Sequence, residues 1–238
     1  TNRQPVSELI MQRMPQTLVL MVTAEVVIIA LSALLGIYSA IKQYSVFDNV
    51  LTGLSFVGFS LPIFFIALTL MFIFAVQFKV WGLPYLPTGA DVWEFTDLPE
   101  LARHLVLPVA SLAIIQVAGY TRYLRSSMLE VLSQDYIRTA RAKGLVEQAV
   151  VVRHALKNAA LPLVTLIGLD APALLAGAIV TETVYSWPGM GRLFWQQAGR
   201  GDYPTVMAIL LIVATAVVFF QIITDVAYTL IDPRIRLS

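Results

Sequence analysis

The stretch DYIRTARAKGL, residues 135–145, is the most informative part of this sequence because it is polar in a chain that is otherwise apolar. Three basic residues, Arg138, Arg141 and Lys143, lie within six positions of one another. Of the 238 residues, 58% are hydrophobic and only 13% are charged, whereas a soluble domain carries about 25% charged residues. The composition indicates a membrane protein, and the question is why it contains a short basic segment.

Long apolar stretches on both sides of this segment predict membrane-spanning helices. A bilayer core about 30 Å thick requires about 20 apolar residues in helical form, and a helix satisfies its own backbone hydrogen bonds in lipid. Five stretches are long enough, and they cover residues 17–41, 51–78, 104–120, 159–184 and 206–231. The sequence therefore predicts an all-α integral membrane fold with five spans.

The distribution of basic residues predicts the orientation of these spans. The connection over residues 121–158 carries seven basic and three acidic residues, whereas the loop over residues 79–103 carries four acidic ones. Cytoplasmic connections are enriched in Lys and Arg. We therefore expect residues 121–158 and the tail over 232–238 to be cytoplasmic and residues 1–16 to be external. An external segment at this point predicts one further span upstream.

The basic segment itself carries the signals of a short helix. Asp135 in the first turn and Lys143 in the last turn are favourable to the helix dipole. Gly144 stands where a left-handed C-terminal cap is expected. Ile137, Ala140 and Gly144 share one small apolar face. Two interpretations stay open, a connection that only sets orientation and a docking helix whose small face meets a cytoplasmic partner.

The same segment resembles the cytoplasmic coupling motif of ABC importer permeases, in the variant found in dipeptide, oligopeptide, nickel and glutathione permeases. The general motif is Glu-Ala-Ala, three residues, Gly, and a Pro thirteen positions beyond the Gly. Arg138, Thr139 and Ala140 occupy the first three places and Gly144 the glycine, whereas Lys157 stands at the proline position.

Other stretches extend the resemblance over essentially the whole chain. They are RHALKNAALPLVT (153–165), FSLP (59–62), ETVYSWPGMGRLF (182–194) and DVAYTLIDPRIR (225–236). The resemblance implies the type I permease fold of ABC importers. That fold contains one more N-terminal span, in agreement with the upstream span expected from the orientation of residues 1–16.

The resemblance also implies a mechanism and a set of partners. Two permeases form the pathway, and each lays a coupling helix into a groove on an ATPase. The partners would be a second, non-identical permease, two ATPase subunits or domains, and a periplasmic or lipid-anchored solute-binding protein, at the bacterial inner membrane. The implied coupling residues are Arg138, Thr139, Ala140, Arg141, Lys143 and Gly144.

ATP and Mg are expected in the partner ATPases. The sequence contains no Walker-type Gly-x-x-x-x-Gly-Lys-Ser/Thr stretch. We therefore expect this chain to bind no cofactor and to be a non-catalytic permease subunit rather than an enzyme.

Three carboxylates inside the apolar spans are candidates for the translocation pathway, where they would meet the amino terminus of a peptide. They are Glu25, Asp170 and Glu182. Carboxylates in a bilayer usually face a bundle interior or an aqueous cavity. A structural hydrogen bond to a neighbouring helix is the alternative for each of them.

Helix-breaking residues mark two further features. SWPGMG (186–191) predicts a tight turn on the external side, and its candidate gate residues are Trp187, Pro188, Gly189 and Gly191. An ordinary external loop is the alternative. Pro62 predicts a kink in the second span because proline removes a backbone donor.

The function favoured by these observations is the transmembrane pathway of an ATP-driven importer for di- or oligopeptides. The solute itself stays open among dipeptides, longer peptides, glutathione, nickel chelates and some sugars. An ATP-independent secondary transporter or channel is the alternative. A membrane enzyme is disfavoured because the sequence lacks the His-Glu-x-x-His and Gly-x-Ser-x-Gly motifs. Its two histidines, His104 and His154, lie 50 residues apart and predict no metal site.

Overall fold

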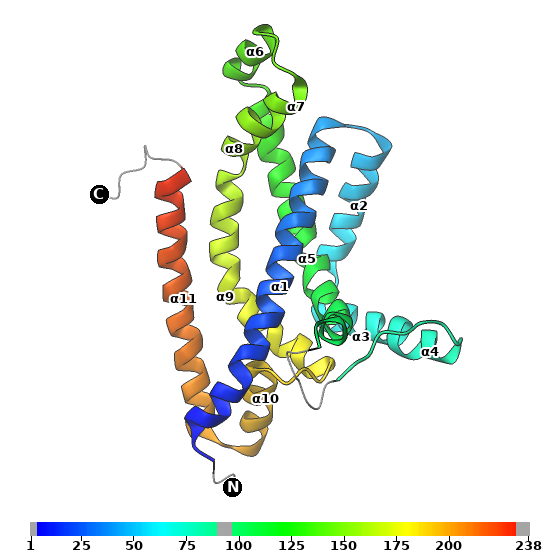
Figure 1. Ribbon diagram of the computed structural model, residues 1–238, viewed down its shortest axis with the longest axis vertical. Coiled ribbons are helices and arrows are strands. Elements are labelled where there is room, and N and C mark those ends of the chain that lie inside the picture. The colour runs from blue at the N-terminus through cyan, green and yellow to red at the C-terminus, as the bar shows by residue number, and fades with distance from the viewer. Residues whose placement is uncertain (1–3, 90–96, 232–238) are drawn as a thin grey trace. The chain divides into compact units, whose positions relative to one another are not determined.

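The computed structural model of the protein describes residues 4–89 and 97–231, and these residues form helices and no strand. Within them, the side chains of residues 169–177, 225 and 227–231 are not described. The elements labelled in Figure 1 are α1 (Val6–Ile41), α2 (Val46–Ser60), α3 (Ile63–Met71), the π-helix η1 (Phe72–Gln77), α4 (Phe78–Val80), α5 (Leu98–Leu132), α6 (Asp135–Ala142), α7 (Glu147–Ala149), the π-helix η2 (Val150–Ala155), α8 (Leu156–Ala159), α9 (Leu161–Val184), α10 (Met190–Arg200) and α11 (Tyr203–Ile231). The predicted all-α fold is confirmed.

Four or five elements of the structure could cross a membrane, and the sequence predicted five spans. Among the described residues, four helices are long and apolar enough to cross a membrane, and a fifth span results if one bent pair is counted. The four are Val6–Ile41, Ile63–Val80, Leu98–Leu132 and Tyr203–Thr224, and the pair is Glu147–Ala159 with Leu161–Gly168, bent by 45°. The helices α1 and α5 also extend well beyond the apolar stretches that predicted them.

The stretch predicted as one span over residues 51–78 is divided in two. Helix α2 ends at Ser60 and α3 begins at Ile63, with Pro62 in extended conformation (φ −63°, ψ 141°) between them. Proline has no N–H to donate, and it disfavours the helical conformation of the residue before it. The kink predicted at Pro62 is therefore a complete break in the helix.

The chain forms two compact units. Unit 1 comprises Thr1–Val27, Leu61–Ile115 and Ala171–Val218, and unit 2 comprises Ile28–Ser60, Gln116–Asp170 and Phe219–Ser238. The four long helices α1, α5, α9 and α11 each contribute residues to both units.

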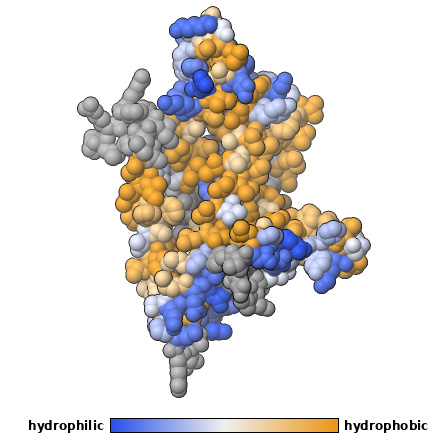
Figure 2. Space-filling model, in the orientation of Figure 1, coloured by the Kyte–Doolittle hydropathy of each residue, from blue (hydrophilic) through white to orange (hydrophobic). Residues whose placement is uncertain are grey.

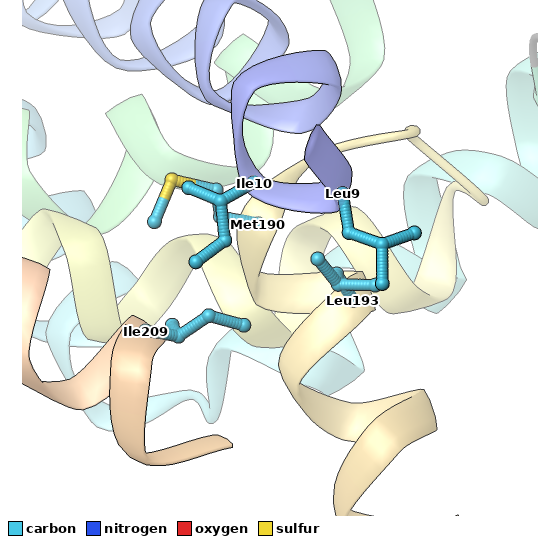
Figure 3. Close-up of a cluster of buried hydrophobic side chains, with 5 residues drawn as sticks. All are labelled: Leu9, Ile10, Met190, Leu193 and Ile209. Carbon is cyan, nitrogen blue, oxygen red and sulfur yellow. The ribbon is translucent and has the colours of Figure 1, made fainter. Parts of the chain in front are cut away.

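Two apolar clusters hold unit 1 together. In the first, Leu9 and Ile10 of α1 meet Met190 and Leu193 of α10 and Ile209 of α11, and the five side chains converge in Figure 3. The second joins α3, α5 and the residue after α9, and consists of Ala67, Leu107 and Tyr185. Outside lipid, apolar burial is the main favourable contribution to packing. Ala67 and Leu107 lie in helices long and apolar enough to cross a membrane, and there close van der Waals packing holds helices together instead.

Unit 2 contains its own buried side chains and also the polar segment around α6. Gly36 of α1 lies so close to α5 that a Cβ there would be 3.2 Å from both the Leu124 Cβ and the Thr121 carbonyl oxygen. A glycine at this position therefore allows the two helices to approach. Figure 2 shows hydrophilic residues gathered around α6 and hydrophobic residues along the long helices of this unit.

Candidate functional site

The basic segment folds into α6 followed by a left-handed turn. Gln134 precedes the helix in extended conformation, and Asp135 lies in its first turn, where a carboxylate is favourable to the helix dipole. Gly144 has φ +77°, and its N–H donates to the Arg141 carbonyl oxygen at 2.9 Å. The left-handed cap predicted at Gly144 is confirmed. Because no atom lies within 4 Å of a Cβ built there, the backbone conformation alone favours glycine.

The small face of α6 is turned toward the chain itself. Ile137 and Ala140 are both buried, and α6 contacts η2, whose Val150 and Val151 are buried as well. The interpretation of Ala140 as a surface for close approach of a partner is therefore wrong. An amphipathic helix buries its apolar face wherever an apolar surface is available, and in this chain η2 provides that surface.

The outer face of α6 presents the other predicted coupling residues to solvent. The exposed ones are Arg138, Thr139 and Arg141 of α6, and Lys143 and Gly144 directly after the helix. Arg138 forms an ion pair with Asp135 at 3.4 Å, and both side chains are largely exposed. An exposed pair of this kind contributes about 1 kcal/mol or less. The ammonium group of Lys143 makes no ion pair with any residue in the described parts of the chain. The outer face is thus basic and available for contact.

Two side-chain links hold α6 against the helices that follow it. Arg141 donates to Glu147 of α7 through both Nε (3.1 Å) and Nη2 (2.7 Å), in a bidentate geometry. Asn158 of α8 donates through Nδ2 to the Tyr136 hydroxyl at 2.9 Å. The second link was not predictable from the sequence, because Tyr136 and Asn158 are ordinary exposed helix residues 22 positions apart.

A buried ion pair lies at the start of α2 in the same unit. Arg125 of α5 donates to Asp48 through Nε at 2.6 Å and Nη2 at 2.7 Å. The Ser39 hydroxyl and the Tyr44 N–H also donate to this carboxylate, the latter at 2.8 Å. Hydrogen bonding to Arg125 holds the pKa of Asp48 well below its usual range, although burial opposes the shift. The carboxylate therefore joins α5 to the turn between α1 and α2.

Asp48 was not among the site residues predicted from the sequence, and Arg125 was considered only as one of the basic residues that predict orientation. One signal was available. Asp48 is an acidic residue in the first turn of α2, and the connection between the first two predicted spans otherwise carries only the basic residue Lys42. That signal does not identify the partner, because the two residues are 77 positions apart.

In unit 1, Glu182 is completely buried at the end of α9 and accepts several hydrogen bonds. The Thr17 hydroxyl donates to Oε1 at 2.7 Å, and the Arg192 N–H donates to Oε2 at 2.9 Å. Thr17 Oγ1 in turn accepts from the N–H of Met190 at 2.8 Å. A pathway residue needs an exposed carboxylate, whereas this one joins α1, α9 and α10. Its surroundings are those of the structural alternative.

The predicted gate residues form the turn that encloses this carboxylate. Trp187 Nε1 donates to the Gln16 carbonyl oxygen at 3.0 Å, and the Pro188 carbonyl oxygen accepts from Arg13 Nη1 at 3.4 Å. Trp187, Pro188, Gly189 and Gly191 are all buried. The tight turn predicted at 186–191 is present, and it packs as part of the interior of unit 1.

Both glycines of the turn are required by close packing. A Cβ at Gly189 would overlap the carboxylate atoms of Glu182, and a Cβ at Gly191 would lie 2.6 Å from the Ile179 Cα. Neither glycine needs its conformational freedom, since neither has a positive φ. The sequence indicated a turn at these residues, but the carboxylate packed against it comes from a preceding helix.

The other two candidate pathway carboxylates lie in different units. Glu25 is half-buried in the part of α1 that belongs to unit 1. Asp170 lies in the part of α9 that belongs to unit 2, and its side chain is outside the described residues. The structure thus gives Glu182 a defined set of partners and leaves Glu25 and Asp170 as pathway predictions.

Comparisons with known proteins agree with this architecture. Residues 32–237 match the family described as "Binding-protein-dependent transport system inner membrane component". The chain is 43% identical over 234 residues to the oligopeptide transport system permease protein AppB of Bacillus subtilis (strain 168), a match that covers 98% of this chain and 72% of that protein. It is 40% identical over 253 residues to the dipeptide transport system permease protein DppB of Escherichia coli (strain K12), with 99% and 75% covered.

Solved structures show the same fold. A chain of the MetNI methionine ABC transporter, in an inward-facing conformation, superposes with a TM-score of 0.72 at 14% identity, covering 97% of this chain and 99% of that chain. The permease fold implied by the motifs is therefore confirmed. From the family match over residues 32–237 and the two relatives, we conclude that this chain belongs to the family of inner membrane components of binding-protein-dependent transport systems.

Proposed function

We propose that this chain forms one half of the transmembrane pathway of an ATP-driven importer of peptides. Support comes from the two relatives, named as oligopeptide and dipeptide permeases, which are 43% and 40% identical over nearly all of this chain. The long apolar helices supply the path through the membrane. The permease subunit is not an enzyme, and ATP and Mg are bound and used by its ATPase partners.

The α6 segment is the contact with an ATPase. The observation that carries this proposal is the two-sided character of α6. Its apolar face is buried on η2, whereas Arg138 and Thr139, together with Lys143 just after the helix, are exposed. A helix seated firmly on its own chain transmits displacement, and an exposed basic rim sets the register of docking. Ala140 contributes by seating α6, and Gly144 contributes by turning the chain at its end.

The assembly contains a second, non-identical permease, two ATPase subunits or domains, and a solute-binding protein. In the bacterial inner membrane, α6 and the C-terminus face the cytoplasm, and the turn that holds Glu182 lies at the external end. Glu25 and Asp170 line the pathway, whereas Glu182 and the buried turn around it form a rigid wall. The complete set of donors around Glu182 supports this division of roles.

Reconstitution tests the proposal. The chain is purified with its companion subunits and placed in vesicles, and uptake of a radiolabelled dipeptide is measured with and without ATP. We expect ATPases to co-purify and uptake to require ATP. Arg138→Glu should reduce both ATPase retention and uptake at matched abundance, whereas the exposed change Gln148→Ser should alter neither. Peptide uptake by the isolated chain without ATP would instead identify a secondary transporter.

A further inference from the structure

The side chain of Arg122, on α5 in unit 2, lies in unusual surroundings for a charged group. Its Cζ lies 5.8 Å from the ring centroid of Phe56 and 5.6 Å from that of Phe59, over the faces of both rings. No hydrogen bond or ion pair to a carboxylate is found for its guanidinium among the described residues. Arg122 itself is exposed, and the two rings are 56% and 60% exposed. Within the part of the chain that the structure describes, the cation is thus held by aromatic faces alone, and its side chain is exposed.

The direction of this side chain is opposite to that expected of an arginine that only sets orientation. Arg125, one turn further along α5, pairs with Asp48 at the start of α2. Phe56 and Phe59 lie eight and eleven residues beyond Asp48, which is about 12 and 16 Å along the helix. Arg122 therefore extends away from the end of the unit where Asp48 lies. An interfacial arginine extends toward the nearer water phase.

The position of the two rings places the guanidinium inside the apolar stretch. Residues 51–78 contain no charged residue, and Phe59 is in the last turn of α2, just before the break at Pro62. Lipid phosphates lie at the membrane surface, so they are poorly placed to meet a group at this depth. Ionisable groups within the membrane usually face a water-filled path and mark the route of a substrate. These features favour an anion in the pathway as the partner of Arg122.

We propose that Arg122, held by Phe56 and Phe59, binds the carboxylate of the peptide solute as it crosses the membrane. The inference rests on the proposed function, because every unmodified peptide carries a C-terminal carboxylate. A guanidinium placed over ring faces keeps its N–H edge available, and that edge matches a carboxylate in a bidentate geometry. Phe56 and Phe59 fix the height of the cation along α2.

The test compares a dipeptide with its C-terminal amide in reconstituted vesicles that contain the complete transporter. The solute-binding protein has its own preference for one of the two solutes. That preference is the same with every permease variant, so it cancels when the acid-to-amide ratio of uptake is compared between variants. The variants are Arg122→Gln, Arg122→Lys and Lys42→Gln, the last being an exposed basic residue of the same unit that serves as a charge-matched control.

We expect Arg122→Gln to lower uptake of the acid about tenfold, equivalent to about 1.4 kcal/mol, while uptake of the amide changes less than about twofold. Arg122→Lys should keep part of the preference for the acid because it keeps the charge. Lys42→Gln should leave the ratio unchanged. The acid-to-amide ratio of uptake is measured within one preparation of each variant. A smaller amount of folded transporter lowers both uptakes equally, so the ratio still shows whether the variant binds the carboxylate.

Three results would overturn the inference. Equal losses for acid and amide, with lower thermal stability of Arg122→Gln, would assign Arg122 to the packing of α2 and α5. Equal losses that depend on the content of anionic lipid in the vesicles would assign it to headgroups. An unchanged ratio with unchanged uptake would leave it without a role in transport. Failure of the proposed function is distinct, because the unmodified transporter would then show no ATP-dependent uptake of either peptide.

Discussion

Substitution of Gly189 by alanine is the most direct test of the turn around Glu182. The backbone of Gly189 is extended (φ −97°, ψ −177°), a conformation that any residue adopts. Alanine therefore introduces no backbone strain. Its Cβ, however, overlaps Oε1, Cδ and Oε2 of Glu182, the three atoms nearest to it. Because Glu182 is completely buried, the carboxylate can yield only by leaving its donors.

The magnitude follows from the hydrogen bonds that are lost. Glu182 accepts from the Thr17 hydroxyl at 2.7 Å and from the Arg192 N–H at 2.9 Å. A hydrogen bond to a charged group contributes about 1.5–3 kcal/mol. Loss of both should lower the free energy of unfolding by about 3–6 kcal/mol. For a chain of this size, about 1 kcal/mol shifts the unfolding temperature by roughly 2–4 °C, so we expect a decrease of about 10 °C.

The assay is thermal unfolding in lipid nanodiscs, with Gly199→Ala as the matched control. Gly199 is exposed in α10, and no atom lies within 4 Å of a Cβ built there. The control should be unchanged or stabilised by up to about 1 kcal/mol, because alanine is the better helix former. In a Glu182→Ala background, Gly189→Ala should have little further effect. An unfolding temperature of Gly189→Ala equal to that of the control would show that the Glu182 carboxylate is not held against this turn.

Other substitutions test the cap of α6 and the buried ion pair. Gly144→Val places a β-branched residue at φ +77° and should reduce dipeptide uptake several-fold at matched abundance, whereas Gly144→Asn should reduce it less because Asn tolerates this region; equal uptake by both would contradict the role of the cap. Asp48→Asn leaves Arg125 without its partner and should lower the unfolding temperature at pH 7, by the equivalent of about 3–5 kcal/mol. Because Arg125 lowers the pKa of Asp48, the unmodified chain should keep this contribution above the unfolded-state pKa of about 3.9 and lose it as the pH falls through the lower folded-state pKa. The variant should lack this acid-dependent loss, and identical pH profiles measured by thermal unfolding would count against the pair.

Features that depend on local pattern were predictable from the sequence. The length and composition of the apolar stretches predicted an all-α membrane fold, because a helix in lipid must satisfy its own backbone. A deviation from regular helix at Pro62, although not its extent, and the left-handed turn at Gly144 follow from the stereochemistry of single residues. The spacing of Ile137 and Ala140 correctly placed them on one face of a helix.

What that face contacts was decided by the tertiary structure. Periodicity determines which side chains share a face, but the same small face fits a partner protein or the chain's own η2, and folding buried it on η2. Glu182 likewise had the sequence features of a pathway carboxylate. In the fold it joins helices, because it accepts a hydrogen bond from Thr17, which lies 165 residues earlier in the chain. A buried carboxylate is stable where donors surround it. Those donors come from helices distant in the sequence, so their positions are fixed only when the helices pack.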